Sequence, residues 1–186
     1  MKRIFLIPVM AFAFVAANTN VALAKGEKTV MVGGAAMYPT KNIVENAVNS
    51  KDHTTLVAAV KAAGLVETLS GPGPFTVFAP TNAAFDMLPK GTVDKLVQPE
   101  MKDQLTGILT YHVVSGKMDA KALMDMVKKG NGQASLTTVQ GETLTVWQQG
   151  NALYVKDAKG GSAKITIKDV YQSNGVIHVI DHVLMP

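Results

Sequence analysis

The segment 176–184 near the end of the chain most constrains the fold, because it is apolar on both faces that a β-strand would present. A strand with one face in water alternates apolar and polar residues, whereas a strand that is apolar on both faces must be covered on both sides. Asn174-Gly175 comes directly before this segment and is the strongest hairpin signal in the chain, because both turn positions favour positive φ. We therefore predict that residues 176–184 lie in the interior and follow a tight turn.

The hydrophobic period changes along the chain from helical to strand-like. Residues 42–127 place most apolar side chains at helical spacing, interrupted by one apolar strand at 75–79. Residues 143–147 and 164–168 instead alternate, as strands with one wet face do. No repeat is long enough to suggest a second domain. The pattern predicts an α+β fold with helices first, an antiparallel sheet last and one core.

Capping residues mark where the predicted helices begin and end. Asn42 with Glu45 has the spacing of a capping box, and Gly64 is a natural helix terminator. Pro99 suits the first turn of a helix that buries Leu105 and Leu109. We expect further N-caps at Asp52 or Thr54, at Thr81 and at Asp119, and a short strand at Tyr111–Val114.

The first 24 residues have the pattern of a secretory signal peptide. Lys2 and Arg3 form a positive n-region, and the apolar stretch 4–17 is shorter than the ~20 residues that a membrane-spanning helix needs. Ala22-Leu23-Ala24 is the small-x-small pattern that a signal peptidase reads. The alternative is an uncleaved membrane anchor, but length and cleavage pattern favour removal after Ala24. We expect export to the periplasm or the exterior of a bacterium, with no transmembrane segment after processing.

The remaining chain divides into a short arm and one domain. Residues 25–41 contain Gly33-Gly34 and Tyr38-Pro39 and show neither a helical nor a strand period. We therefore predict that they form an N-terminal arm along the domain. The domain itself is expected to cover residues 42–186.

Composition excludes several classes of function. The chain has no cysteine, which excludes disulfides, zinc–thiolate sites, iron–sulfur clusters and cysteine nucleophiles. Its formal charge of +4 falls to +2 when residues 1–24 are removed, and the only arginine goes with them. The sixteen lysines that remain are scattered among acidic residues, which is typical of a solvated surface. Without arginine the chain is poorly equipped to read bases or grip phosphates, so we expect no nucleic-acid partner.

The sequence carries no recognisable catalytic or cofactor motif. It has neither G-x-S-x-G nor a P-loop, and prolines in Gly71-Pro72-Gly73-Pro74 occupy positions whose amides would hold phosphate. His178 and His182 are four residues apart, but on a strand their rings would lie about 13 Å apart and could not share a metal ion. Met126 belongs to an apolar helix face, which favours a core role over copper binding. We predict no metal, no cofactor and no enzymatic activity.

Four polar residues interrupt apolar segments, and buried polar groups need hydrogen-bond partners. His112 lies in a short apolar run, His178 and Asp181 interrupt the last strand, and Asn82 follows the strand at 75–79. We expect Asn82, His112, His178 and Asp181 to form a structural polar network that fixes helix against strand. A catalytic role for the cluster is the alternative.

Three segments together resemble the signatures of the fasciclin domain family. They are Phe75–Phe85 (FTVFAPTNAAF), Tyr111–Val114 (YHVV) and Asn174–Pro186 (NGVIHVIDHVLMP). The three occur in the family's order and at compatible spacing, and the similarity runs from about residue 41 to residue 186. Ala83 replaces an acidic residue that is frequent in the first signature. The chain is most similar to small secreted bacterial members with a single domain.

The resemblance implies a compact wedge in which antiparallel, β-sandwich-like sheets pack with several α-helices. It also implies an extracellular or cell-surface adhesion module without a known catalytic activity. In animal members the Tyr-His motif and its aliphatic neighbours have been tied to integrin binding, which carries over here to Tyr111, His112, Val113 and Val114 as candidate partner-binding residues. A bacterium has no integrin of its own, so that ligand does not transfer. The same four residues could equally be core, and we favour core.

Three functions from different classes follow from these observations. The leading hypothesis is an exported adhesion module that binds a protein or glycan on a cell surface or matrix, with the 25–41 arm as one candidate contact. The alternative is a periplasmic binder of a small apolar ligand or lipid, because the chain is rich in valine, leucine and alanine. The third is a hydrolase that uses buried His and Asp, although no nucleophile can be placed.

Signal-peptide removal is directly measurable on protein purified from its native host. We expect the intact mass to correspond to a chain that begins at Lys25, because cleavage follows Ala24. A mass that includes Met1 would contradict the signal-peptide assignment.

Overall fold

The computed structural model describes residues 28–186, so the predicted signal peptide and its cleavage site lie outside the described residues. Several of its helices are single turns, and most of its strands are in the last third. The helices are α1 (Ile43–Ala47), α2 (Thr54–Ala63), α3 (Val66–Ser70), α4 (Asn82–Asp86), α5 (Thr92–Leu96), α6 (Lys102–Tyr111) and α7 (Ala120–Lys129), with 3-10 turns η1 (Lys51–His53) and η2 (Pro99–Met101). The strands are β1 (Val30–Val32), β2 (Ala35–Met37), β3 (Phe75–Pro80), β4 (Val113–Ser115), β5 (Gln133–Thr137), β6 (Thr143–Gln149), β7 (Ala152–Lys156), β8 (Ser162–Gln172) and β9 (Gly175–Ile180).

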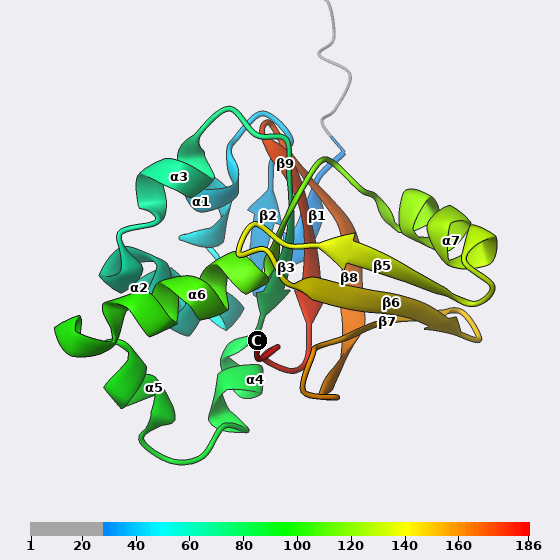
Figure 1. The fold of residues 1–186 in the computed structure, drawn as a ribbon. Coiled ribbons are helices and arrows are strands. Elements are labelled where there is room, and N and C mark those ends of the chain that lie inside the picture. Colours follow the sequence, from blue (N-terminus) through cyan, green and yellow to red (C-terminus); the bar gives the residue numbers. More distant parts are fainter. Residues whose placement is uncertain (1–27) are drawn as a thin grey trace, which may run out of the picture.

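Seven strands form one continuous hydrogen-bonded order, β4-β3-β9-β8-β7-β6-β5. The long strand β8 pairs with β7 through its first residues and with β9 through the rest, and its register shifts at Ile165, Ile167 and Val170. These irregularities let β8 belong to both halves of the sheet, so that β5, β6 and β7 form a second layer (Figure 1). The predicted α+β wedge with sandwich-like, mostly antiparallel sheets is confirmed. The exception is β3, which runs parallel to β9.

Strands β3 and β9 form the central layer, and each is buried on both faces. Val77 and Val179 point into a core cluster beneath α1, α2, α3 and α6. Phe78 and Ile180 point the other way, into a second cluster formed with β5, β6, β7 and α7. Figure 1 shows these helices and strands on opposite sides of the β3–β9 layer. All six residues of β9 are buried, which confirms the interior position predicted for this part of 176–184.

The turn before β9 differs from the predicted one. Gln172 pairs with Gly175, so the two turn residues are Ser173 and Asn174, and neither Asn174 nor Gly175 has a positive φ. Gly175 is needed for a different reason, because a Cβ there would lie 2.2 Å from the carbonyl oxygen of Phe75 on β3. The hairpin prediction is therefore correct in place and wrong in turn geometry.

Asn174 is the hydrogen-bonding centre of this end of the molecule, and it is 8% exposed. Its side-chain oxygen accepts from the backbone N–H of Ile43, the first residue of α1, at 3.0 Å. Its amide nitrogen donates to the carbonyls of Leu69 and Gly71 at the end of α3, both at 2.8 Å. Its own carbonyl accepts from the N–H of Phe75, the first residue of β3, at 3.0 Å. One residue thus joins the β8–β9 hairpin to two helices and to the central layer.

Most of the local helix signals are confirmed. The Asn42–Glu45 capping box is complete, and Thr81 and Asp119 cap α4 and α7 through their side chains. Gly64 ends α2 in the left-handed conformation, with φ of 74°. The predicted N-cap of α2 is wrong, because His53 occupies that position without a capping side-chain bond.

Two other expectations are corrected. The region predicted as an irregular arm contains the β1–β2 hairpin, which turns at Gly33 and Gly34 and places Val32 and Met37 in the first core cluster. The predicted strand at Tyr111–Val114 begins only at Val113, because Tyr111 is the last residue of α6. The strand thus begins at the β-branched residues Val113 and Val114, whereas Tyr111 belongs to the helix before it.

Asn174→Ala is expected to lower the free energy of unfolding by about 2–4 kcal/mol, because it leaves one buried N–H and two carbonyls without their partner. Urea unfolding of both proteins measures the difference. Asn151→Ala, which changes an exposed asparagine in a turn, is the matched control and should stay within about 0.5 kcal/mol of wild type. A loss of less than 1 kcal/mol in Asn174→Ala would contradict the central role of this side chain.

Candidate functional site

Tyr111 lies at the centre of the second core cluster and is completely buried. Its hydroxyl donates to the carbonyl of Thr143 on β6 at 3.2 Å and accepts from the N–H of Ala158, in the loop after β7, at 2.9 Å. Burial raises the pKa of Tyr111 above its ordinary value. The side chain therefore links the end of α6 to β6 and to the loop after β7.

His112 links the segment after β9 to the same helix by hydrogen bonds. Its Nδ1 lies 2.8 Å from the carbonyl of Ile108 and therefore carries the proton, while Nε2 accepts from the backbone N–H of Leu184 at 3.0 Å. Burial lowers the pKa of His112 to about 4, although the Ile108 carbonyl favours the charged form. The ring is therefore neutral near pH 7, and a second proton would remove the acceptor that holds Leu184.

The four candidate partner-binding residues are all in the interior. Tyr111, His112, Val113 and Val114 are between 0% and 5% exposed. A partner at the surface of the folded domain cannot reach them, so the candidate partner contact is wrong and the segment is part of the core, the role that we favoured.

His178 has the opposite ring orientation in a similar role. Its Nε2 donates to the carbonyl of Met118 at 2.9 Å, and Nδ1 accepts from the N–H of Asp169 at 3.4 Å. The ring stacks on Phe78 of β3 with centroids 5.8 Å apart. Burial lowers its pKa, so this histidine is also neutral near pH 7. His178 therefore joins β9 to the irregular part of β8 and to the segment between β4 and α7.

Asn82 and Asp181 lie elsewhere. The side-chain oxygen of Asn82 accepts from the N–H of Thr55 at 3.0 Å, and its nitrogen donates to the carbonyl of Lys51 at 2.8 Å. Asn82, on α4, therefore supplies the missing cap of α2. Asp181 accepts from the N–H of Lys164 at 2.8 Å.

The predicted single network is therefore wrong. No hydrogen bond among the described residues joins any two of Asn82, His112, His178 and Asp181. Each side chain instead bonds backbone groups elsewhere in the fold, so there are four separate polar contacts where one network was expected.

Metal ligands do not gather in the part of the chain that the structure describes. Within residues 28–186 no three His, Asp or Glu side chains are placed to hold one ion. His182 lies beyond the end of β9 and is exposed beside Asp181, with Nδ1 2.8 Å from its carboxylate. It is therefore separate from the buried ring of His178.

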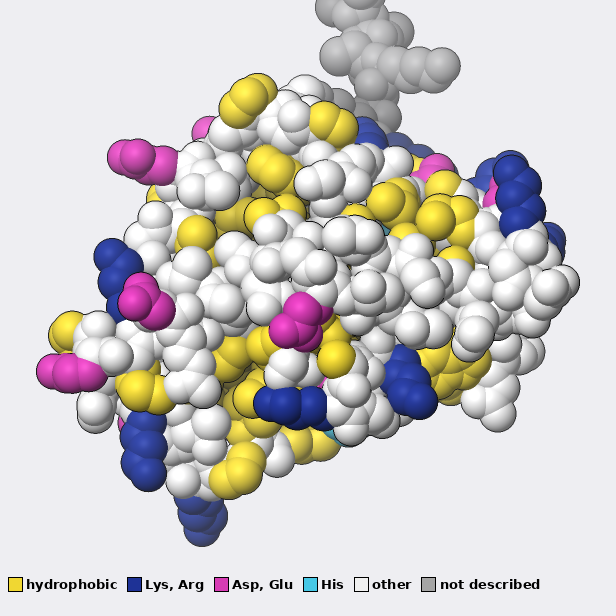
Figure 2. All heavy atoms as spheres, viewed as in Figure 1, with side chains coloured by type: hydrophobic (Ala, Val, Ile, Leu, Met, Phe, Trp, Pro, Cys, Tyr) yellow, Lys and Arg dark blue, Asp and Glu magenta, His cyan; other side chains and the backbone are white. Residues whose placement is uncertain are grey.

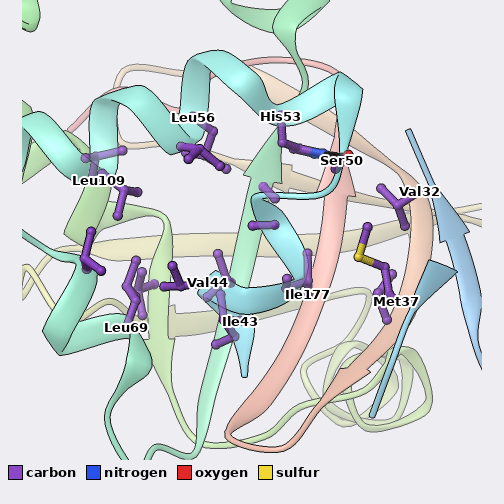
Figure 3. Close-up of a pocket in the computed structure, with 18 of the residues that line it drawn as sticks. Val32, Met37, Ile43, Val44, Ser50, His53, Leu56, Leu69, Leu109 and Ile177 are labelled. Carbon is purple, nitrogen blue, oxygen red and sulfur yellow. Dashed lines mark hydrogen bonds between the residues drawn. The ribbon is translucent and has the colours of Figure 1, made fainter. Parts of the chain in front are cut away.

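An apolar pocket lies in the first core cluster, with a cavity volume of about 60 Å³. Its walls come from α1, α2, α3, the β1–β2 hairpin and the central layer, as Figure 3 shows. His53 and Ser50 are its buried polar residues, and Nδ1 of His53 lies 2.9 Å from the Ser50 hydroxyl. Nε2 of His53 has no hydrogen-bond partner in the described chain. Burial lowers the pKa of His53 below its ordinary value.

A row of side chains crosses the outer face of the second layer. Gln133, Trp147, Tyr154 and Lys164 are successive cross-strand partners on β5, β6, β7 and β8. We call these four residues the aromatic row. The rings of Trp147 and Tyr154 stack with centroids 5.3 Å apart, and both are half-exposed. The intervening residues of β6 and β7 point into the core, so the aromatic row faces away from it.

Sequence reasoning missed both the pocket and the row. The alternation in 143–147 already placed Trp147 on the wet face, but its neighbours depend on the register of four strands. The pocket had no sequence signal beyond His53, because its walls come from segments far apart in the chain.

Comparison with known proteins identifies the fold family. The fasciclin domain model matches residues 51–186. The chain belongs to the fasciclin domain family. All three segments that resembled the fasciclin signatures lie within the matched residues, and so do the central layer and the aromatic row.

Relatives cover most of this fasciclin chain. Protein sll1483 of Synechocystis is 50% identical over 162 residues, which cover 86% of this chain and 82% of that protein. The cell surface glycolipoprotein MPB83 of Mycobacterium bovis is 37% identical over 160 residues, which cover 83% of this chain and 64% of that protein. The solved structure of a FAS1 domain pair from the insect cell adhesion molecule fasciclin I has a TM-score of 0.71 at 18% identity, covering 80% of this chain and 52% of that one. That similarity establishes the fold.

Buried neutral histidines make the stability of the domain depend on pH. His112 takes up a proton near pH 6.5 when unfolded but only near pH 4 when folded, so its contribution is present above pH 6.5 and is lost as pH falls toward 4. The shift corresponds to roughly 3 kcal/mol. His53 and His178, whose pKa values are also lowered, act in the same direction.

His112→Gln should therefore flatten the fall in unfolding free energy between pH 6.5 and 4, because an amide does not titrate but can still donate and accept. Urea unfolding across this range measures the slope. Asn151→Ala changes an exposed residue that carries no charge and should leave the slope as in wild type. Equal slopes for His112→Gln and wild type would contradict the assignment.

Proposed function

We propose that this protein is an exported, non-catalytic adhesion module that binds a protein or glycan on a cell surface or in a matrix. Membership of the fasciclin domain family carries the proposal. Two of the similar proteins are described by their names as a cell surface glycolipoprotein and a cell adhesion molecule. The signal-peptide pattern at 1–24 is consistent with the same location.

The aromatic row is the proposed contact surface. Tryptophan and tyrosine combine a large apolar face with a polar edge, and they are over-represented among residues that dominate binding energy. Trp147 and Tyr154 are held rigid by stacking and by strand register, so little side-chain freedom is lost on binding. Gln133 and Lys164 flank them and supply hydrogen-bond donors.

The surface charge is consistent with this function. In the face of the molecule that Figure 2 shows, lysines and acidic side chains are interspersed and do not form a single-sign patch. A nucleic-acid site would need a concentrated positive surface. Within residues 28–186 the structure contains no helix that is both long and apolar enough to cross a membrane.

The buried polar groups support a non-catalytic role. Ser50 and His53 are a serine–histidine pair by distance, but Ser50 is 2% exposed and lies against Gly33. Within residues 28–186 no carboxylate bonds the other ring nitrogen, so the described arrangement lacks the group that orients a catalytic histidine. The rings of His112 and His178 are fully engaged with backbone groups.

Cell binding by fluorescently labelled protein tests the proposal. We expect saturable binding to cells of the protein's own species or to a host cell surface. The double substitution Trp147→Ala with Tyr154→Ala should raise Kd at least about ten-fold, because it removes the aromatic contact area. Protease treatment of the cells should abolish binding if the partner is a protein, and periodate treatment if it is a glycan.

Met87→Ala is the matched control, because Met87 is an exposed hydrophobic residue at the end of α4, outside the aromatic row. Circular dichroism checks that each variant is folded. Absence of saturable binding by folded wild type would overturn the adhesion function. Wild-type affinity in the double variant would overturn the aromatic row as its contact surface.

A further inference from the structure

The outer face of the second layer extends beyond the aromatic row, and its charged side chains are lysines. We infer that this face binds an acidic polysaccharide, with a sugar ring on Trp147 and Tyr154 and carboxylates of the polymer at Lys164 and Lys168. The inference rests on the proposed adhesion function and names the chemical class of its partner. Strand register, a surface hollow and the absence of ion pairs at these lysines support it.

Strand register defines which side chains share this face with the aromatic row. Residues two apart on a strand point to the same side of the sheet, and so do cross-strand partners. The next row across the same four strands is therefore Ser135, Thr145, Lys156 and Ser162. Neither row contains an aspartate or a glutamate. Lysines and neutral polar groups thus surround the two aromatic rings.

A hollow of about 390 Å³ adjoins the Lys164 end of the aromatic row. It lies where β8 leaves β7, because β7 pairs with β8 only as far as Lys164 and the rest of β8 pairs with β9. Its lining includes Lys164, Thr166 and Lys168 of β8 and Gln149 and Asn151 at the β6–β7 turn, and all five are exposed. Small-molecule sites have volumes of about 300–1,000 Å³. Because Lys164 belongs to both the row and the hollow, one extended ligand can contact both.

The lysines of this face have no ion-pair partner in the described chain. None of Lys156, Lys164 and Lys168 forms an ion pair within residues 28–186. The carboxylate of Asp169, on β8, accepts from the backbone N–H of Ala120. The carboxylate of Asp181, after β9, accepts from the backbone N–H of Lys164. The three ammonium groups are thus left for an external anion, and their charge favours an anionic partner.

The composition of the face favours a polysaccharide over an acidic protein. A protein interface has an apolar core, whereas the two rows contain hydroxyl, amide and ammonium groups around only two aromatic rings. Sugar hydroxyls both donate and accept, so they match these polar groups, and the stacked rings supply apolar surface for one face of a sugar. Residues 28–186 contain no arginine, which disfavours a polymer of phosphates. A uronic acid combines hydroxyls, an apolar ring face and a carboxylate, and so matches all three features.

Titration calorimetry of the purified protein with a galacturonic acid hexamer tests the inference. We expect saturable binding that weakens when the salt concentration is raised about ten-fold, because exposed charges are screened. Lys164→Gln combined with Lys168→Gln should raise the Kd of the hexamer at least about five-fold, because two charge contacts are lost. Maltohexaose, a neutral hexamer, and polyglutamate, an acidic peptide, should each bind at least about five-fold more weakly than the uronate hexamer.

The matched control is Lys90→Gln combined with Lys95→Gln, which removes the same charge from exposed positions before and within α5. Figure 1 shows α5 on the opposite side of the molecule from β7 and β8, so this variant should bind the hexamer as wild type does. Circular dichroism checks that both double variants are folded.

The same proteins in the cell-binding assay separate this inference from the adhesion function. Cell binding by wild type without saturable binding of the uronate hexamer, or with equal hexamer affinity in the two lysine double variants, would overturn the inference and leave adhesion standing. Polyglutamate that binds as tightly as the hexamer would overturn the polysaccharide in favour of an acidic protein. Hexamer binding without cell binding would overturn the adhesion function and support the site alone.

Discussion

The hydrogen bonds of Asn174 are the contacts on which the arrangement of the helical half depends. One side chain fixes the start of α1 and the end of α3, and its backbone carbonyl fixes the start of β3. Ile43 of α1 and Leu69 of α3 also line the apolar pocket. Because the amide both donates and accepts, no carboxylate or aliphatic residue of similar size could make the same set of bonds. A turn residue from the far end of the chain thus holds two of the segments that line the pocket.

The strand-rich half is joined to the helices in a different way, through buried rings. Tyr111, His112 and His178 each use a side chain to satisfy backbone groups from two or more elements. Neutral histidine suits this position because one nitrogen donates while the other accepts, which matches a carbonyl on one side and an N–H on the other. The Tyr-His motif of the family thus has an architectural role here.

Signals that act within a few residues predicted the structure correctly, whereas features that depend on distant segments could not be predicted from the sequence. The caps at Asn42, Thr81 and Asp119 act within four residues and were predicted correctly, whereas α2 is capped by Asn82 from another helix. The two-faced apolar pattern placed β9 in the interior but could not show that its parallel neighbour is β3. The wet face of β6 was predictable from its period, but the aromatic row required the register of four strands. The pocket required side-chain packing from six or more segments, for which a single sequence contains no direct signal.

The parallel pairing of β3 with β9 has a consequence for how the chain acquires its structure. Phe75 pairs with Gly175, one hundred residues later, so the central layer cannot form until almost the whole chain is available. Contacts of such long sequence separation form late and slowly, because a large loop must close first. A polypeptide that emerges from a ribosome in N-to-C order therefore cannot complete its central layer until β9 has emerged. The topology therefore makes the pairing of β3 with β9 one of the last steps in the folding of this domain.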